Sequence, residues 1–315
     1  MKNIIIAAAM VMLTAVSGFC SDKPVISVNQ IVEHPSLDAM RNGFIDTLKE
    51  AGIDAEYNVH IAQGNQATNI QIASQIMGEK PDLILAITTP SSQVIAQKIK
   101  DIPVVFSGVT DPVAAGLVSS LEAPGANVTG MTDMSPVDEH LALIREFVPG
   151  LKTLGVLYNS GEPNSVVLLE AMKAEAEKAG IAVEEATAIN SGAVYQAAKS
   201  LVGRCDAVYV PVDNTVVSAL ESAVKVCSQN RLPLFTADTD SVDRGSIAAL
   251  AVDYYRMGRQ TGEMALRILK DGARPADMPV ESLKNLRLHV NTKSAAAMGV
   301  TVPESVLKRA DKIVE

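Results

Sequence analysis

The sequence contains no tryptophan, three cysteines and four histidines, and aromatic residues make up only 3% of its 315 positions. The histidines are scattered along the chain and lack the close spacing of metal ligands. No nucleophile-elbow or dinucleotide-binding glycine motif is present. The net charge is −9, and no Lys/Arg cluster appears. We therefore expect no catalytic centre, no metal, no cofactor and no nucleic-acid partner.

Long apolar runs are also missing after the first two dozen residues. Residues 1–23 place Lys2 before an apolar run and then small residues, which is the order of a secretory signal peptide. The run is too short to span a bilayer comfortably. We expect an exported protein in the periplasm or another extracytoplasmic compartment. A lipid anchor at Cys20 stays open but is not favoured, because Phe19 stands where a small residue is wanted.

The remaining two cysteines leave two alternatives. Cys205 precedes an apolar run and Cys227 ends the next helical pattern, so both would lie at the same edge of a sheet. In an oxidising compartment they would form a disulfide. They would otherwise be two separate buried thiols.

Short apolar, β-branched runs alternate with amphipathic segments through the rest of the chain. Such runs suit parallel strands that are buried on both faces. They are residues 25–31, 83–87, 103–109, 154–158, 207–212, 233–236 and 247–252. The helical spacing of the apolar residues between 37 and 51, closed by Gly52, completes a β-α unit. We expect an α/β protein with doubly wound parallel sheets.

The number of β-α units is too large for one compact sheet, so we expect two lobes. Lone extended stretches near 127–134, 247–253 and 286–291 lack helical crossovers and suit a three-strand hinge. The expected divisions are a signal peptide at 1–23, lobe 1 at 24–133 plus 248–281, and lobe 2 at 134–247 plus 282–315.

Several strand-like runs end in short polar residues followed by a helix start. Parallel sheets bind ligands beyond the carboxyl ends of their strands, so these loops would converge on one cleft. Each residue could equally be a helix cap, but their convergence favours a binding site. The candidate ligand-binding residues are Gln30, Ser36, Thr89, Ser91, Ser92, Thr110, Asp111, Glu162, Asn164, Ser165, Asp213, Asn214, Asp238 and Thr239.

Ordered motifs across residues 24–315 resemble the substrate-binding proteins of ATP-driven (ABC) importers, in the family with tryptophan-binding and related amino-acid-binding members. The motifs include ATNIQIASQI (67–76), ITTPSSQ (87–93), VVFSGVTDPVAAGLV (104–118), LYNSGEPNS (157–165) and PVDNTVVSA (211–219). The resemblance implies the type I periplasmic-binding fold. It also implies a monomer that delivers a small ligand, a free and possibly aromatic amino acid, to a membrane permease and its ATPase.

The resemblance and side-chain chemistry together suggest roles for the candidate residues. Thr89 and Ser91 would donate to an α-carboxylate, and Glu162 and Asp213 would accept from an α-ammonium. Asn164, Ser165, Asp238 and Thr239 would orient the ligand. An aromatic wall would come from Phe106, Tyr158, Phe235 or Tyr254, although all four also suit a core. A sensor input, a sugar or nucleoside ligand and a periplasmic enzyme are the alternatives.

Overall fold

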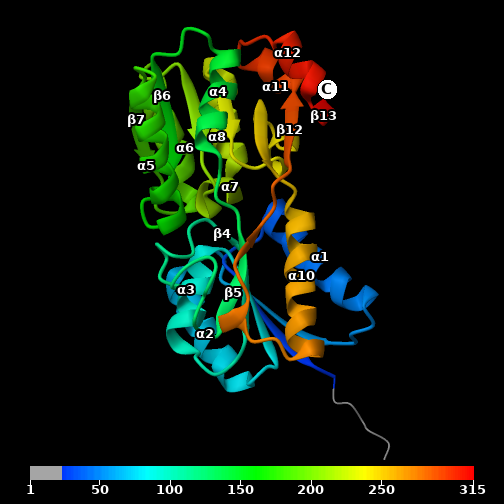
Figure 1. Ribbon diagram of the computed structural model, residues 1–315. Coiled ribbons are helices and arrows are strands. Elements are labelled where there is room, and N and C mark those ends of the chain that lie inside the picture. The colour runs from blue at the N-terminus through cyan, green and yellow to red at the C-terminus, as the bar shows by residue number, and fades with distance from the viewer. Residues whose placement is uncertain (1–22) are drawn as a thin grey trace, which may run out of the picture.

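The protein consists of two α/β lobes joined end to end. The computed structural model describes residues 23–315. Of the expected signal peptide it includes only Lys23, and Cys20 lies outside the described residues. Figure 1 shows the first lobe, blue to cyan with an orange helix, below the second, which is mainly green, yellow and red. Within the described residues no helix is both long and apolar enough to cross a membrane.

The first lobe is a six-stranded parallel sheet in the order β11-β5-β4-β3-β1-β2 with helices on both faces. Its strands are β1 (Val25–Gln30), β2 (Glu56–Ile61), β3 (Leu83–Ile87), β4 (Val104–Val109), β5 (Val128–Thr132) and β11 (Glu281–Ser282). Its helices are α1 (Pro35–Glu50), α2 (Gln66–Glu79), α3 (Thr89–Lys98), α10 (Tyr254–Asp271) and the 3-10 turn η2 (Pro275–Asp277). Strand β3 is buried along its whole length, as its continuous apolar run predicts.

The second lobe has a four-stranded parallel sheet, β7-β6-β8-β9, beside a three-stranded sheet, β10-β12-β13. The strands are β6 (Thr153–Tyr158), β7 (Ala182–Thr187), β8 (Ala207–Val210), β9 (Leu234–Thr236), β10 (Ala248–Val252), β12 (Leu286–Asn291) and β13 (Lys312–Val314). The helices are α4 (Val137–Phe147), α5 (Pro163–Lys178), η1 (Ser191–Ala193), α6 (Val194–Ser200), α7 (Asn214–Ser218), α8 (Leu220–Asn230), α9 (Asp240–Asp243), α11 (Thr292–Ala297) and α12 (Glu304–Arg309).

The two lobes have separate apolar cores, so each buries its own sheet. All seven predicted apolar runs form strands. Strands β2 and β7 are not among the predicted runs; they lie at sheet edges and are partly exposed along most of their length. An edge strand needs no continuous apolar run, so the pattern that marks buried strands is absent there.

The chain crosses between the lobes three times, as expected for the type I periplasmic-binding fold. It leaves the first lobe after β5, returns between β10 and α10, and leaves again between β11 and β12. The lobe 1 segment was expected to begin at residue 248, but β10 pairs antiparallel with β12 of the second lobe. We therefore propose that the second crossing lies at Asp253.

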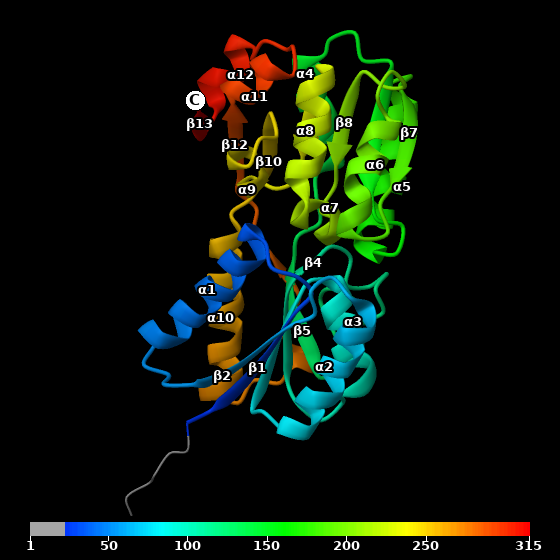
Figure 2. The same ribbon diagram turned by 180° about the vertical axis from the view of Figure 1, so that it is seen from behind.

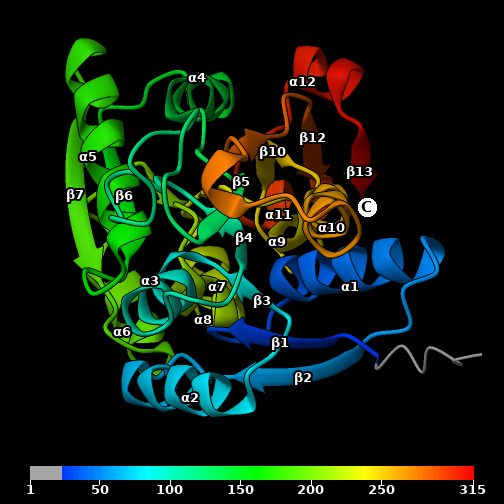
Figure 3. The same cartoon turned by 60° about the horizontal axis from the view of Figure 1, so that its bottom comes forward.

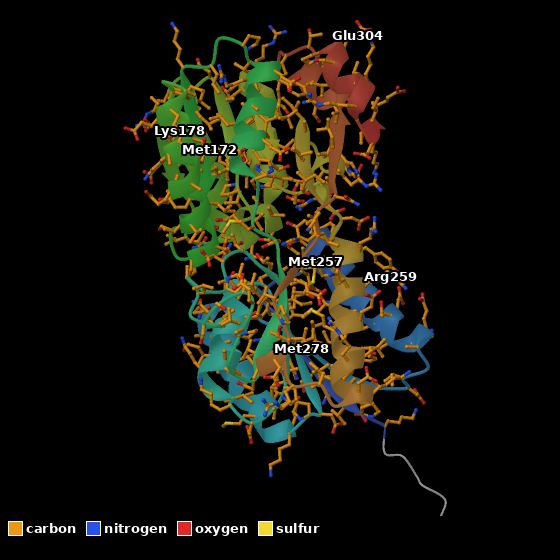
Figure 4. All side chains as sticks on the ribbon, in the orientation of Figure 1. Met172, Lys178, Met257, Arg259, Met278 and Glu304 are labelled. Carbon is orange, nitrogen blue, oxygen red and sulfur yellow. The ribbon has the colours of Figure 1, made fainter. Side chains whose placement is uncertain are left out.

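Helix α10 ties the second crossing back to the first lobe by packing directly on α1, as Figure 3 shows from below. Two glycines allow this close approach. A Cβ at Gly43 would lie 2.2 Å from Tyr255 O, and one at Gly258 would lie 2.0 Å from Met40 O. Met257, labelled in Figure 4, is fully buried on the part of α10 nearest the second lobe. The tight helix pair gives the hinge a rigid base on the first lobe.

Cys205 and Cys227 do not form a disulfide in the structure, which favours the alternative of two separate thiols. Cys205 and Cys227 are both free thiols, the first partly buried and the second buried. Burial raises the pKa of Cys227 to about 12, so it behaves as a small apolar side chain.

Candidate functional site

The carboxyl ends of the parallel strands in the two lobes face each other across the junction. Figure 2 shows α3 at the upper end of the first lobe and α7 at the lower end of the second. A pocket lies between them. Its lining residues come from both lobes and from the crossings: His34, Ser36, Leu37, Thr88, Gly108, Thr110, Asp133, Asn164, Val212, Asp213, Asn214, Val217, Asp238 and Tyr254.

The first lobe contributes hydroxyl groups that the protein itself leaves unused. Thr88, Thr89 and Ser91 are buried at the start of α3, and their side-chain oxygens have no hydrogen-bond partner among the described residues. Buried polar groups are nearly always paired, so three orphans at one helix start indicate a missing partner. The α3 amino terminus adds free backbone N–H groups and a positive dipole end. Together these groups suit a carboxylate.

The backbone at this point is strained. Thr88 has φ +79°, a conformation that a β-branched residue rarely adopts. Such outliers persist only where the surrounding structure holds them, and they concentrate at ligand sites. Here the strained residue also lines the pocket.

The second lobe contributes buried carboxylates. Asp213 caps α7 through Val216 N at 2.7 Å, and also accepts from Asn159 N at 2.6 Å and Ser165 Oγ at 2.7 Å. Burial raises the pKa of Asp213, and the nearby charge of Glu162 raises it further. A cation placed beside it would stabilise its charged form.

The position of Glu162 does not suit the suggested role of accepting from a ligand ammonium. Its two oxygens accept from the backbone and side chains of Asn214 and Thr215 at 2.6 to 3.1 Å, and Asn164 Nδ2 lies at 3.2 Å. Glu162 does not line the pocket but an outer chamber that opens next to it. Its protein partners already satisfy it, so we infer that Glu162 orders the start of α7.

Asp238 and Ser36 connect the lobes inside the pocket. Ser36 Oγ donates to Asp238 Oδ1 at 3.2 Å, and Ser241 donates to the same carboxylate through its N–H and hydroxyl at 2.9 and 2.6 Å. Burial raises the pKa of Asp238 as well. The bond to Ser36 requires the lobes to be close together.

Asp133 and Tyr254 close the hinge side of the pocket. Asp133 accepts from Thr110 Oγ1 at 3.2 Å and lies 3.4 Å from the Tyr254 hydroxyl, which donates to it. Burial raises the pKa of Asp133 to about 6. Asp133 is not among the predicted site residues, although it follows β5 at the first crossing, where a polar strand end would be expected to face the cleft.

His34 was not among the candidate ligand-binding residues, yet it lines the pocket, as does Leu37. It is 9% exposed, and its Nδ1 atom has no hydrogen-bond partner in the described part of the chain. Burial lowers the pKa of His34 to about 3, with a smaller lowering from the charge of Arg244. The imidazole is therefore neutral.

The remaining predicted site residues divide into three groups. Ser36, Thr110, Asn164, Asp213, Asn214 and Asp238 line the pocket. Thr89 and Ser91 lie buried beside the lining residue Thr88. The others support their own loops or do not line the pocket: Gln30 bonds Val32 O and Asp38, Ser92 bonds Thr88 O, Asp111 caps a turn, Ser165 bonds Asp213, and Thr239 precedes α9.

The charges of the pocket are one-sided. Asp133, Asp213 and Asp238 line it, whereas no lysine or arginine from the described residues does so. Within residues 23–315 no group of three or more His, Cys, Asp and Glu is arranged to hold a metal ion. Burial raises the pKa of all three carboxyl groups, and a cation placed among them would favour their charged forms.

Comparison with known proteins places this geometry in context. The family model for ABC transporter substrate binding proteins matches residues 25–314. A curated tyrosine-binding protein of Clostridioides difficile (strain R20291) is 39% identical over 277 residues, which are 87% of this chain and 80% of that protein.

Two solved structures resemble the chain along most of its length. A conserved domain protein from Vibrio cholerae O1 biovar El Tor has a TM-score of 0.91 and 44% identity. An ABC domain in complex with L-Trp from Streptococcus pneumonia has a TM-score of 0.89 and 35% identity. Each comparison covers 93% of this chain and 100% of the other.

Proposed function

The chain belongs to the ABC transporter substrate-binding protein family, and on that premise we propose that it captures a free aromatic amino acid between its lobes. Proteins of this family work outside the cytoplasm, bind a small molecule and serve an ABC transporter; the family is not a class of enzymes. The partners of this chain would be a membrane permease and its ATPase, with the protein acting as a monomer.

The observation that carries this proposal is the opposite chemistry of the two halves of the cleft. One half holds the unpaired hydroxyls at the start of α3, and the other holds buried carboxylates without a side-chain cation. A zwitterion satisfies both, because its carboxylate suits the α3 amino terminus and its ammonium suits the carboxylates. A sugar or nucleoside has neither the carboxylate nor the ammonium group.

The apolar part of the pocket suits an aromatic side chain. Leu37, Val212, Val217 and Tyr254 contribute apolar surface. Tyr254 is the one residue of the expected aromatic wall that lines the pocket, while Phe106, Tyr158 and Phe235 lie in the cores. The relatives named for tyrosine and tryptophan support the same ligand class.

Lobe closure would convert binding into a signal for the transporter. A ligand that touches both lobes binds the closed form better than the open one and shifts the equilibrium toward it. The permease would then recognise the closed form. A receptor that recognises it instead would make the protein a sensor input, and we favour transport because the family serves transporters.

The amino-terminal sequence concerns where the protein works. Residues 1–23 would direct export to the periplasm and then be removed, with a lipid anchor at Cys20 not favoured.

Mass spectrometry of the natively purified protein tests this function. Denaturation should release an unmodified aromatic amino acid, because a binding protein leaves its ligand unchanged. Release of a sugar or nucleoside would contradict the proposed ligand. Conversion of an added amino acid into another compound would favour the enzyme alternative.

A further inference from the structure

The carboxylate and the ammonium of a bound amino acid do not explain the role of His34 in the pocket. It follows β1, precedes α1 and is buried. Its Nδ1 atom has no partner among the described residues. The hydroxyls at α3 suit a ligand carboxylate and the buried carboxylates suit an ammonium, which leaves the unpaired His34 nitrogen available for a further polar atom of the ligand.

The electrostatic state of His34 fits a neutral partner. Burial and the nearby guanidinium of Arg244 keep the pKa of the imidazole low, so it carries no charge near neutral pH. A neutral imidazole has one donor and one acceptor nitrogen, and the tautomer decides which is which. It can therefore accept from a phenol O–H or an indole N–H, and it can also donate to a phenol oxygen.

The pocket wall that contains His34 also contains apolar side chains. Leu37 and Val217 line the same pocket and contribute aliphatic surface. The guanidinium of Arg244 is held by Glu221 and by Val217 O, at 2.7 to 2.9 Å, and does not line the pocket. The pocket wall thus offers aliphatic surface for an aromatic ring next to polar groups, among them His34 and the neighbouring Asn214.

We propose that His34 hydrogen-bonds the polar atom of the ligand's aromatic side chain, so that the site selects a phenol or indole over a plain phenyl ring. This assignment rests on the proposed function. A ring without a polar atom would leave the buried imidazole unpaired, and pockets built around a substrate O–H or N–H discriminate strongly for that reason.

His140 is fully used by the protein and His289 is half-buried away from the pocket, so the two differ from His34. Both ring nitrogens of His140 are used, by Tyr209 OH at 2.8 Å and Leu250 O at 2.7 Å. His289 also has an unpaired Nδ1, but it lies on β12 and does not line the pocket. Only His34 combines an unpaired nitrogen with a place in the pocket wall, among the described histidines.

Titration calorimetry with L-tyrosine, L-tryptophan and L-phenylalanine tests the assignment in the wild-type protein, His34→Leu, His34→Gln and the control His289→Leu. Wild type should bind tyrosine or tryptophan at least ~10-fold more tightly than phenylalanine. His34→Leu should lose that preference while it keeps its affinity for phenylalanine, which also reports an intact cleft. His34→Gln should restore part of the preference, and His289→Leu should keep all of it.

Three results would overturn the assignment. The first is no preference in wild type, and the second is an equal loss for all three ligands in His34→Leu, which would place His34 on the shared main chain. The third is binding of none of them by wild type, which would remove the proposed function as well. The first two leave the proposed function standing, so the two failures are distinguishable.

Discussion

Ser36 and Asp238, 202 positions apart in the sequence, form a hydrogen bond across the cleft, with the Ser36 hydroxyl donating to Oδ1 at 3.2 Å. Ser36 lies on α1 of the first lobe, and Asp238 precedes α9 of the second. The structure therefore represents the closed form, in which the two lobes share a polar contact inside the pocket.

Ser36→Ala should shift the protein toward the open form. A net hydrogen bond contributes about 1 kcal/mol, so ligand affinity should fall about fivefold. Small-angle X-ray scattering of the ligand-free variant should show a larger radius of gyration. Ser241→Ala removes a bond to the same carboxylate within one lobe and is the control. It should lower the melting temperature without opening the cleft, and equal opening in both variants would contradict the interlobe role.

Removing the unpaired hydroxyls of α3 should weaken binding without weakening the fold. Thr89→Val and Ser91→Ala each remove a buried oxygen that has no partner among the described residues. If each oxygen binds the ligand carboxylate, affinity should fall about 10- to 150-fold, since bonds to charged groups contribute about 1.5 to 3 kcal/mol. Calorimetry measures the loss, and the ligand-free melting temperature should hold or rise.

Ser92→Ala is the matched control for these two variants. Ser92 Oγ donates to Thr88 O at 2.7 Å, so its loss should cost stability. Its ligand affinity should change little. A larger affinity loss in Ser92→Ala than in Ser91→Ala would contradict the assignment of the carboxylate site.

Asp213→Asn should weaken an amino acid more than its analogue without the amino group. Truncating the charge of a buried ion pair costs about 2 to 5 kcal/mol in binding. Asparagine can still cap α7 through Val216 N, but its NH2 group cannot accept from Asn159 N and Ser165 Oγ, so the variant should lose about 1 kcal/mol of stability as well. Calorimetry with L-tyrosine and 3-(4-hydroxyphenyl)propionate separates the two effects. An equal loss for both ligands would mean that Asp213 serves only as a cap.

Stability should respond to pH through Asp133. Burial raises its pKa from 3.8 to about 6 in the folded protein, so the folded state favours the protonated acid. The resulting stabilisation is full below pH 3.8 and is lost as the pH rises through about 6, an effect of about 3 kcal/mol. His34 and His140 have pKa values lowered to about 3 and about 4, so they act in the opposite direction below pH 6.5.

Asp133→Asn isolates the contribution of Asp133 from that of the histidines. The difference in unfolding free energy, wild type minus variant, should fall between about pH 4 and pH 6 and then stay level. Urea unfolding at several pH values measures it. A difference that rises over this range would mean that the folded protein favours the charged carboxylate.

The sequence predicts the position of the cleft better than it predicts which side chains line it. Buried strands reveal themselves by apolar runs such as 83–87, and parallel topology then brings their carboxyl ends together. The direction of each side chain depends on how the loops pack. Ser91 and Ser92 are neighbours in the same motif, yet Ser92 bonds its own helix start while Ser91 is left unpaired.

His34 and Asp133 were the pocket residues that were hardest to predict. His34 precedes a helix without acting as a side-chain cap, and a single histidine in a sequence carries no sign of burial. Asp133 lies at a crossing between the lobes. Its burial depends on Thr110 and Tyr254, which are 23 and 121 positions away in the sequence. Such positions follow from how the two lobes meet.

Calorimetric titration of the refolded, ligand-free protein with L-tyrosine, L-tryptophan, D-galactose and adenosine tests the central claim most directly. The cleft pairs unused hydroxyls with buried carboxylates, so an aromatic amino acid should bind in a 1:1 complex and the two uncharged compounds should not. Saturable binding of the sugar or the nucleoside, with no heat from either amino acid, would contradict the account.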